Sequence, residues 1–408
     1  MGNFHSKMKI LFCLDSLELG GAERQALLLA EHLQSEGCDI LLWGLGKPGK
    51  VSMLCDEKKI IWESKFSWIQ KSLHKEIYGF LKMILDIKRF SPSIIIPFCT
   101  IPSLLCALTW RFTKTRACIW NERDIGLFHM LQQAYPFAFK LSTCIVANSI
   151  EGKNFLQKNY GDDLDIRVIN NGVHISPPGE TRKVWKEKLG AEESALIVCM
   201  VANIHKRKNH QLLIEAWNEA IISSIIPNNS MLVFAGHEFD AEHLKNKVLN
   251  YGLQNNIKFL GAVDDIAGLL SAVDIGVLSS FNEGQPNALL EYMQAGLPII
   301  ASDLPCIREL LQDTDSILFK NDSINDFIAA IEQMSFVDRR REAGLRNREI
   351  CKQKYLSEQM FAEYKTLFDE LLNKKRPKLP LFFLLSIFIF FSKYYFNRIR
   401  NKVLRATI

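Results

Sequence analysis

Two glutamates stand eight positions apart in the stretch 280–303, which reads SFNEGQPNALLEYMQAGLPIIASD. Glu283 follows an apolar run typical of a buried strand and precedes a glycine turn at Gly284, and Glu291 lies one turn inside the helical run that comes next. Asn287 is of a residue type that caps helix starts. Carboxylates accept paired hydrogen bonds from vicinal sugar hydroxyls, and helix-start amides suit a phosphate. This pattern indicates a nucleotide-sugar site. The spacing also arises by chance, with Glu291 as an ordinary surface residue.

Three consecutive basic residues, Lys206, Arg207 and Lys208, stand in ANIHKRKNH (202–210). They follow another strand-like run and precede a helical pattern, so they can neutralise a diphosphate bound at the end of that strand. A solvated basic turn explains the same three residues as well.

A glycine pair, Gly20 and Gly21, follows the first apolar run and opens a helical segment. Glycines let the backbone approach an anion, and a helix start favours negative charge, so a phosphate is the expected ligand. A tight strand–helix turn accounts for the pair equally well. A dehydrogenase is disfavoured, because G-x-G-x-x-G is absent and Asp39 lies at the start of its strand rather than at the end.

Strands and helices must hold these residues in place, and the sequence pattern predicts that the two alternate along the chain. Apolar strand-like runs alternate with helical segments, which indicates an α/β protein with open parallel sheets. The pattern breaks at ISPPGETRK (175–183), which reads as an interdomain linker, and then restarts. The predicted strands are 9–15, 39–45, 93–99, 117–122, 144–149 and 166–172, then 195–204, 230–237, 257–263, 274–280 and 297–303. We therefore predict two doubly wound Rossmann-like domains at 8–177 and 185–355, a crossover helix at 356–375 and a tail at 376–408.

The order and context of these motifs resemble the GT-B retaining glycosyltransferases of the large GT4 family. The resemblance covers about residues 8–375 and rests on LGGAE, VANIHKRKNH, FLGAVDDI, AVDIGVLSS and EGQPNALLEYMQAGLPIIASD. It implies two Rossmann-like domains facing a cleft. It also implies roles for single residues: Glu283 contacts the donor sugar, Glu291 holds the ribose hydroxyls, and Lys208 binds the donor diphosphate with the amides of Asn287 and Ala288. Gly20 and Gly21 approach the donor phosphate and the acceptor, and the segment 261–263 lies near the base.

Two departures from the family pattern bear on catalysis. Asn203 stands where the family commonly has an arginine beside the lysine, so His205 or Arg207 would share the phosphate charge. The segment that often carries a histidine reads IWNERDIG here, so Glu122 or Arg123 would replace that contact. A non-catalytic nucleotide-sugar-binding or scaffold protein of the same fold is the alternative.

The C-terminal tail differs from the rest of the chain. From Lys374 to the end there are nine basic and no acidic residues, while the preceding body has 41 basic and 45 acidic residues. An apolar run, LPLFFLLSIFIFF (379–391), lies inside this tail and is short for a membrane span, which needs roughly 20 residues. We expect it to lie in an anionic membrane surface, with a spanning helix or a buried helix of the fold as alternatives. A myristoylation pattern in MGNFHS is a further alternative anchor.

The predicted function is a hexosyltransferase-type transfer of a sugar from a UDP-sugar or another nucleotide diphosphate sugar to an acceptor, with retention. No cofactor and no metal are expected, because no D-x-D motif ends a strand. The acidic body argues against a nucleic-acid partner.

We expect a polyprenyl-diphosphate-linked acceptor in surface polysaccharide assembly, with a soluble small acceptor as the alternative. Ten scattered cysteines without C-x-x-C predict reduced thiols in the cytoplasm, so the expected location is the cytoplasmic face of the membrane.

Overall fold

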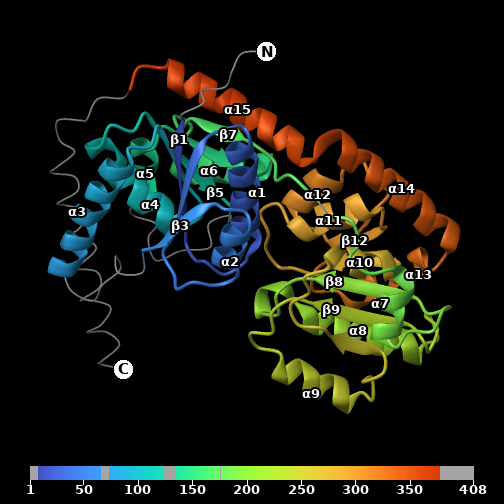
Figure 1. Ribbon diagram of the computed structural model, residues 1–408. Coiled ribbons are helices and arrows are strands. Elements are labelled where there is room, and N and C mark those ends of the chain that lie inside the picture. The colour runs from blue at the N-terminus through green and yellow to red at the C-terminus, as the bar shows by residue number, and fades with distance from the viewer. Residues whose placement is uncertain (1–7, 66–72, 124–134, 175, 377–408) are drawn as a thin grey trace, which may run out of the picture. The chain divides into compact units, whose positions relative to one another are not determined.

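The computed structural model describes residues 8–65, 73–123, 135–174 and 176–376, and these divide into two compact units. The first unit takes the described residues up to Asn148, Gly152–Ile169 and the described chain from Phe361 onward. The second unit takes Ser149–Glu151 and Asn170–Met360. Figure 1 shows that each unit contains its own sheet.

The first unit is built on a seven-stranded parallel sheet with the order β3-β2-β1-β4-β5-β6-β7. The strand order reverses between β1 and β4, which is where ligands bind in doubly wound folds. The strands are β1 (Lys9–Leu14), β2 (Asp39–Gly44), β3 (Ile61–Ser64), β4 (Ile94–Pro97), β5 (Ala117–Glu122), β6 (Cys144–Ala147) and β7 (Ile166–Val168).

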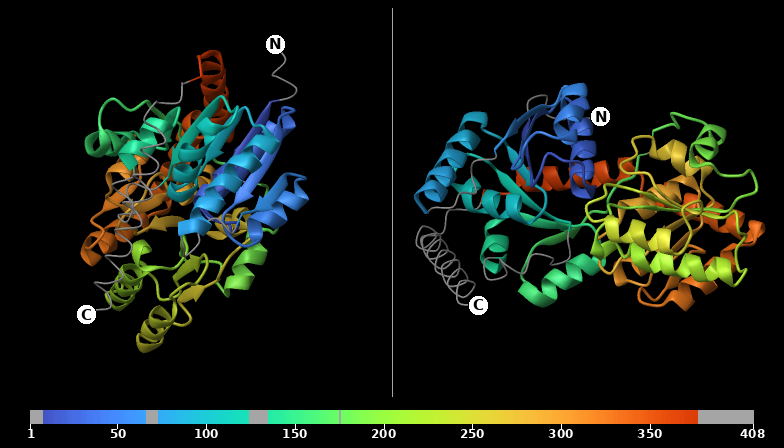
Figure 2. Two further views of the ribbon diagram at one scale, coloured as in Figure 1. Left: turned by 90° about the vertical axis from the view of Figure 1, so that its left-hand side faces the viewer. Right: turned by 90° about the horizontal axis from the view of Figure 1, so that it is seen from below.

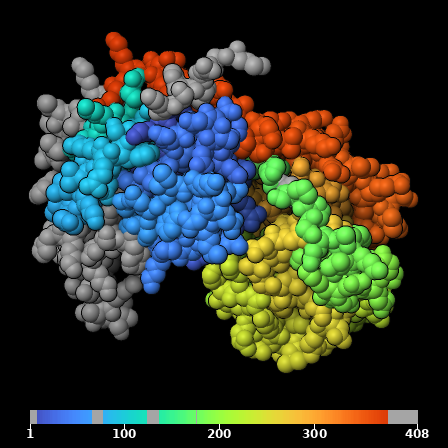
Figure 3. Space-filling model, viewed as in Figure 1, coloured from blue at the N-terminus to red at the C-terminus, as the bar shows by residue number. Residues whose placement is uncertain are grey.

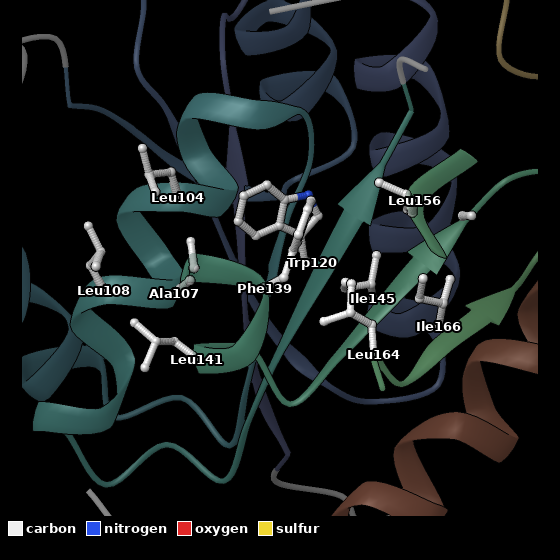
Figure 4. Packing of buried hydrophobic residues seen from close by; sticks show 12 residues of the cluster. Leu104, Ala107, Leu108, Trp120, Phe139, Leu141, Ile145, Leu156, Leu164 and Ile166 are labelled. Carbon is white, nitrogen blue, oxygen red and sulfur yellow. The ribbon is translucent and has the colours of Figure 1, made fainter. Parts of the chain in front are cut away.

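Helices cover both faces of this sheet (Figures 1 and 2). They are α1 (Gly21–Ser35), α2 (Lys50–Glu57), α3 (Leu73–Phe90), α4 (Thr100–Thr109), the 3-10 turn η2 (Trp110–Phe112), α5 (Tyr135–Leu141) and α6 (Ile150–Tyr160). Figure 4 shows one core cluster, in which Trp120 of β5 packs against Phe139 of α5 with ring centroids 4.6 Å apart. The strands are apolar nearly throughout because both faces of the sheet are covered.

The second unit repeats this design with a six-stranded parallel sheet of order β10-β9-β8-β11-β12-β13, which reverses between β8 and β11. Its strands are β8 (Ile197–Val201), β9 (Met231–Ala235), β10 (Ile257–Phe259), β11 (Ile275–Leu278), β12 (Ile299–Ser302) and β13 (Ile317–Phe319). Its helical elements are α7 (Arg182–Leu189), η4 (Lys206–Lys208), α8 (His210–Ile222), α9 (Glu242–Asn250), α10 (Ile266–Ala272), α11 (Asn287–Ala295), α12 (Pro305–Leu311), α13 (Ile324–Met334), α14 (Val337–Lys354) and the start of α15 (Ser357–Asn373).

All eleven predicted strands are present, so the two Rossmann-like sheets are confirmed. The structure adds two edge strands, β3 and β13. The change of unit falls between Ile169 and Asn170, earlier than the predicted boundary at 177. The predicted linker is bound to the second unit, because the carboxylate of Asp265 accepts hydrogen bonds from the N–H groups of Gly179 and Glu180, each at 3.0 Å.

The long helix α15 belongs to both units, since the first unit includes it from Phe361 onward. Near its C-terminus Glu370 accepts from both terminal nitrogens of Arg167, at 2.8 and 3.0 Å, which ties the helix to β7. The predicted membrane-associating tail lies outside the described residues beyond Arg376. Among the residues that the structure describes, no helix has the length and apolar character needed to cross a membrane.

Candidate functional site

The predicted site residues of the second unit gather at the carboxyl ends of β8 and β11, where its strand order reverses. The basic turn η4 follows β8, and the loop with Glu283 and Gly284 follows β11 and leads into α11. The structure therefore brings Lys208, Glu283 and the N-terminus of α11 to one edge of one sheet, which is the ligand-binding edge of this fold.

Lys208 and Glu283 form an ion pair in which Nζ donates to Oε1. The two side chains are only 18% and 12% exposed, so the pair is shielded from bulk water, and its attraction is less screened than at an open surface. The backbone carbonyl of Glu283 also accepts from the thiol of Cys306 at 3.2 Å. The residue predicted to bind the diphosphate, Lys208, and the residue predicted to bind the sugar, Glu283, are thus in direct contact.

The two loops that carry this pair are hydrogen-bonded to each other. The hydroxyl of Ser279 donates to the carbonyls of Lys208 and Asn209, at 2.9 and 3.1 Å, and the N–H of Phe281 donates to the carbonyl of Arg207 at 2.9 Å. Asn209 adopts the left-handed conformation (φ +52°) and donates from its amide to the carbonyl of Asn321 at 2.8 Å. The position of Lys208 relative to Glu283 is therefore fixed by the backbone.

A network of buried amide groups holds the loop before α11. The amide of Asn171 donates to the carbonyl of Gln285 and to Oδ1 of Asn287, both at 2.9 Å, and its backbone N–H donates to Oε1 of Gln285 at 2.5 Å. Gln285 in turn donates to Oδ1 of Asn170 at 3.0 Å. These contacts explain why Asn170 and Asn171 belong to the second unit.

The prediction that Asn287 caps α11 through its side chain is wrong. Pro286 occupies the N-cap position, Asn287 is the first helical residue, and its side-chain oxygen is used by Asn171. The helix start therefore has no side-chain cap. The N–H groups of a first helical turn lack partners within the helix, so this end of α11 retains the character of an anion site.

Glu291 is only 6% exposed, so its alternative interpretation as an ordinary surface residue is wrong. The next residue, Tyr292, is fully buried and anchors the helix to the sheet. Its hydroxyl accepts from the N–H of Val201 at 2.6 Å and donates to the carbonyl of Val277 at 3.3 Å. Gly276 makes room for this ring, because a Cβ there would lie 2.4 Å from it.

Buried polar atoms without a hydrogen-bond partner among the described residues stand close to the pair in the sequence, and they include Nε of Arg207 and Oγ of Ser280. An unpaired buried polar atom costs about 1–3 kcal/mol, so such atoms are expected mainly where function requires them.

Asn203, which stands where the family commonly has an arginine, has a structural contact: its Oδ1 accepts a hydrogen bond from the N–H of His237 at 3.1 Å. It fastens the turn after β8 to the turn after β9.

Two histidines next to the basic turn are held neutral. Burial, and then the charges of Arg207 and Lys208, lower the pKa of His205. Burial, and then the charge of Lys208, lower the pKa of His210 to about 3. The ring of His210 packs edge-on against Phe234, with centroids 5.0 Å apart. The positive charge at this edge is therefore carried by the lysines and Arg207, not by histidine.

The low pKa of His210 makes the folded protein sensitive to acid. An unfolded chain binds a proton at this ring below about pH 6.5, whereas the folded chain does not until about pH 3. Stability is therefore lost as the pH falls through 6.5, by about 1.4 kcal/mol per pH unit well below that value. Urea unfolding at pH 7.5, 6.5 and 5.5 should show a shallower pH dependence for His210→Leu than for the wild type. Equal slopes would exclude this role of His210.

The predicted residues of the first unit lie at the start of α1, after β1. Gly20 is its N-cap residue and Gly21 its first helical residue. A Cβ on Gly20 would meet Oε2 of Glu23 at 2.5 Å, so a carboxylate already covers this glycine. A phosphate can approach Gly20 only if that flexible side chain turns away.

The segment expected to replace a family histidine is largely structural. Asn121 is fully buried and Arg123 nearly so. The guanidinium of Arg123 donates to Oδ1 of Asn121 at 3.2 Å and to the hydroxyl of Tyr364 at 2.8 Å, and it lies 5.0 Å from the centre of the Phe98 ring. Arg123 thus fastens α15 to β5. Glu122 accepts from the indole of Trp120 at 3.1 Å.

Sequence patterns missed the residues that position the others: Asn170, Asn171, Gln285 and Tyr292. Only their burial and pairing reveal them, because an amide in a loop has no periodic pattern. In the part of the chain that the structure describes, no three His, Cys, Asp or Glu side chains come together as a metal site would require.

Two family models match the chain. Residues 19–176 match the model described as Glycosyltransferase Family 4, and residues 195–335 match the model described as Glycosyl transferases group 1. Together the two matches take in well over half of the 408 residues. The first match covers most of the first sheet, and the second covers the site built on β8, β11 and α11.

Curated relatives match over about half of their own length. The chain is 32% identical over 208 residues to the UDP-Gal:alpha-D-GlcNAc-diphosphoundecaprenol alpha-1,3-galactosyltransferase of Escherichia coli, which is 49% of this chain and 53% of that protein. It is 29% identical over 190 residues to the N-acetyl-alpha-D-glucosaminyl L-malate synthase of Bacillus anthracis, which is 46% of this chain and 49% of that protein.

Solved structures share the fold over nearly the whole chain. Anabaena HepE, solved in complex with UDP and glucose, has a TM-score of 0.78 at 19% identity and matches 89% of this chain and 100% of its own. WaaG, a glycosyltransferase involved in lipopolysaccharide biosynthesis, has a TM-score of 0.67 at 15% identity and matches 90% and 100%. At these identities the likeness shows the fold alone.

Proposed function

Because the chain belongs to the GT4-like glycosyltransferases of GT-B fold, we propose that it transfers a sugar from a nucleotide diphosphate sugar to an acceptor, with retention at the anomeric carbon. The observation that carries this proposal is the Lys208–Glu283 pair beside the N-terminus of α11. One edge of one sheet then offers a cation for a diphosphate, a carboxylate for hydroxyls and a helix start for phosphate oxygens.

Charge development explains how these groups promote the reaction. When the bond between the sugar and the diphosphate breaks, negative charge grows on the leaving diphosphate. Lys208 and the amides of Asn287 and Ala288 stabilise that charge, and stabilisation that is stronger in the transition state than in the ground state accelerates the step. The partly buried pair holds the lysine in place in advance. Arg207, whose buried Nε has no partner among the described residues, supplies a second cation.

The carboxylates bind the two ends of the donor. Glu283 accepts from hydroxyls of the transferred sugar, and donor binding exchanges part of its contact with Lys208 for these hydrogen bonds. Glu291 binds the ribose hydroxyls. Gly20 and Gly21 contribute to phosphate and acceptor binding once Glu23 has moved. No step in this scheme uses a metal, because Lys208 and the helix start supply the positive charge at the diphosphate.

The acceptor is proposed to be lipid-linked, in the assembly of a surface polysaccharide or glycan. The E. coli relative carries a diphosphoundecaprenol acceptor in its name, and a LpsE relative of Rhizobium meliloti, 27% identical over 197 residues, acts in lipopolysaccharide core biosynthesis. The basic, apolar residues 376–408 support a place at the cytoplasmic face of a membrane. Deletion of residues 379–408 should therefore weaken membrane association, and association that the deletion leaves unchanged would contradict this part of the proposal.

The proposal is tested first by nucleotide binding and turnover. A thermal-shift screen of UDP, GDP and ADP should find one that stabilises the protein, by about 2.7 kcal/mol at a hundred times its Kd. The matching nucleotide sugars should then release nucleoside diphosphate in the presence of EDTA. Binding without turnover of any donor would favour a nucleotide-sugar-binding scaffold, and turnover that EDTA abolishes would contradict the metal-free scheme.

A further inference from the structure

Helix α3 of the first unit exposes an apolar face to solvent. Its outward positions follow helical spacing, so they lie on one side of the helix. Four of them are large apolar residues with exposed fractions between 45% and 68%: Ile77, Tyr78, Leu81 and Leu85. Figure 3 shows α3, in cyan at the left, as part of the surface of the first unit. Scattered exposed apolar residues are ordinary, but a contiguous apolar stripe on one helix marks an interaction surface.

The opposite face of α3 is firmly packed, so its exposed face is not the result of a loose helix. Met83 and Ile87 are buried in a core cluster with Trp43 of β2 and Trp110 of η2. Phe80 packs edge-on against Phe112, with ring centroids 6.1 Å apart. The helix thus presents two apolar faces, of which the fold covers one.

Among the described side chains of α3, the charges that border the exposed stripe are positive. Lys82, Lys88 and Arg89 are exposed and share the outward half of the helix with the apolar residues. Among the side chains of α3 that the structure describes, the acidic one is Asp86, and it is turned aside, because its side chain is only 13% exposed and its carboxylate pairs with Lys65 at 2.9 Å. An apolar stripe bordered by cations matches a surface that is apolar inside and anionic at its rim.

The described chain ends close to this helix. The guanidinium of Arg376 donates to the carbonyls of Arg111 and Thr113, at 2.9 and 2.5 Å. Phe112, between those two residues, is the ring that packs against Phe80 of α3. The apolar run 379–391 begins three residues after Arg376 in the sequence. The chain therefore leaves the described structure beside α3 and continues into its most apolar segment.

We propose that the outer face of α3 is a docking surface for an anionic phospholipid membrane. The apolar side chains enter the boundary between headgroups and acyl chains, and the three cations contact lipid phosphates. The C-terminal segment is the other candidate to cover this face. It is disfavoured by charge, because the six charged residues of 377–408 are all basic, as are the exposed charges among the described side chains of α3. This inference is independent of the transfer chemistry proposed above.

Vesicle binding of the full-length protein tests this surface. In Leu81→Ser/Leu85→Ser, we expect the partition constant for phosphatidylcholine vesicles with 30% phosphatidylglycerol to fall by about tenfold or more. The control Ile222→Ser/Leu249→Ser removes two similarly exposed side chains from α8 and α9 of the second unit, at 73% and 58% exposure, and should bind like the wild type. Equal binding of the α3 variant and the control would overturn the proposal.

Two further measurements separate the membrane from other occupants. Lys82→Gln/Lys88→Gln/Arg89→Gln should lower binding to the anionic vesicles by about tenfold or more and leave binding to pure phosphatidylcholine unchanged. An environment-sensitive dye on Leu85→Cys, corrected for wild-type labelling, should report water in solution and an apolar medium with vesicles. A dye that already reports an apolar medium without vesicles would show that the tail or a second copy covers α3, and would overturn the proposal.

Discussion

Lys208→Met is expected to lower kcat/KM for sugar transfer by about a thousandfold. Removing one group that stabilises charge developing in a transition state typically costs a factor of about 10² to 10³, and Lys208 is the residue of the basic turn that pairs with Glu283. The loss should include a fall in kcat, because the diphosphate gains a further negative charge as the bond to the sugar breaks. Steady-state kinetics of nucleoside diphosphate release provide the measurement.

The matched control for this variant lies two residues away. Lys206 belongs to the same turn but is exposed, so Lys206→Met removes the same charge from nearly the same place. We expect it to change kcat/KM only a few-fold, through the general field of the site. Equal losses in the two variants would mean that the basic turn acts by bulk charge alone. Unchanged kinetics in Lys208→Met would remove Lys208 from the mechanism.

Glu283→Gln should have an effect of similar size with a different signature. The substitution keeps the shape of the side chain but removes the negative charge that pairs with Lys208. We expect transfer to fall by about 10³ while the affinity for the free nucleoside diphosphate changes only a few-fold, since the proposed contact is with the sugar. Isothermal titration with the nucleotide and turnover of the nucleotide sugar measure the two quantities separately. Weak nucleotide binding with normal turnover of bound donor would contradict this role.

Glu215→Gln is the control for this second variant. Glu215 forms a comparable ion pair with Lys247 between α8 and α9, with both side chains 26% exposed, and lies outside the residues assigned to the site. Its loss should leave turnover unchanged. The double variant Lys208→Met/Glu283→Gln should lose less than the two single variants predict when added, because the residues contact each other. Strict additivity would indicate that the ion pair has no functional coupling.

The sequence was sufficient for the sheets and for the parts of the site that follow strands. Both sheets are covered on their faces, so their strands are almost continuous apolar runs and are easy to recognise. The edge strand β3 was missed, and Ile61, Glu63 and Ser64 are exposed there; β13 was also missed, and its first two residues are only half-buried.

The details of the site depended on packing that a linear pattern does not contain. Asn287 is of a residue type that often caps helices. Its side-chain oxygen instead accepts a hydrogen bond from Asn171, which lies more than a hundred positions earlier. Arg123 is of a residue type that often contacts substrates, but here it binds the hydroxyl of Tyr364 and lies over the ring of Phe98. In both cases the competing partner is distant in sequence and close in space. The spacing of Glu283 and Glu291 gave no indication that the first pairs with Lys208 and the second is buried.

The stereochemistry of the product tests the central claim most directly. The full-length protein is incubated with the nucleotide α-sugar that it turns over and with a polyprenyl-diphosphate-linked sugar as acceptor. The lipid product is then extracted, and its new linkage is assigned by NMR from the coupling constants at the anomeric carbon. A new α-linked sugar, formed by the wild type and at most at trace level by Lys208→Met, is the predicted result. A β-linked product, or bound nucleotide sugar that is never transferred, would contradict the account.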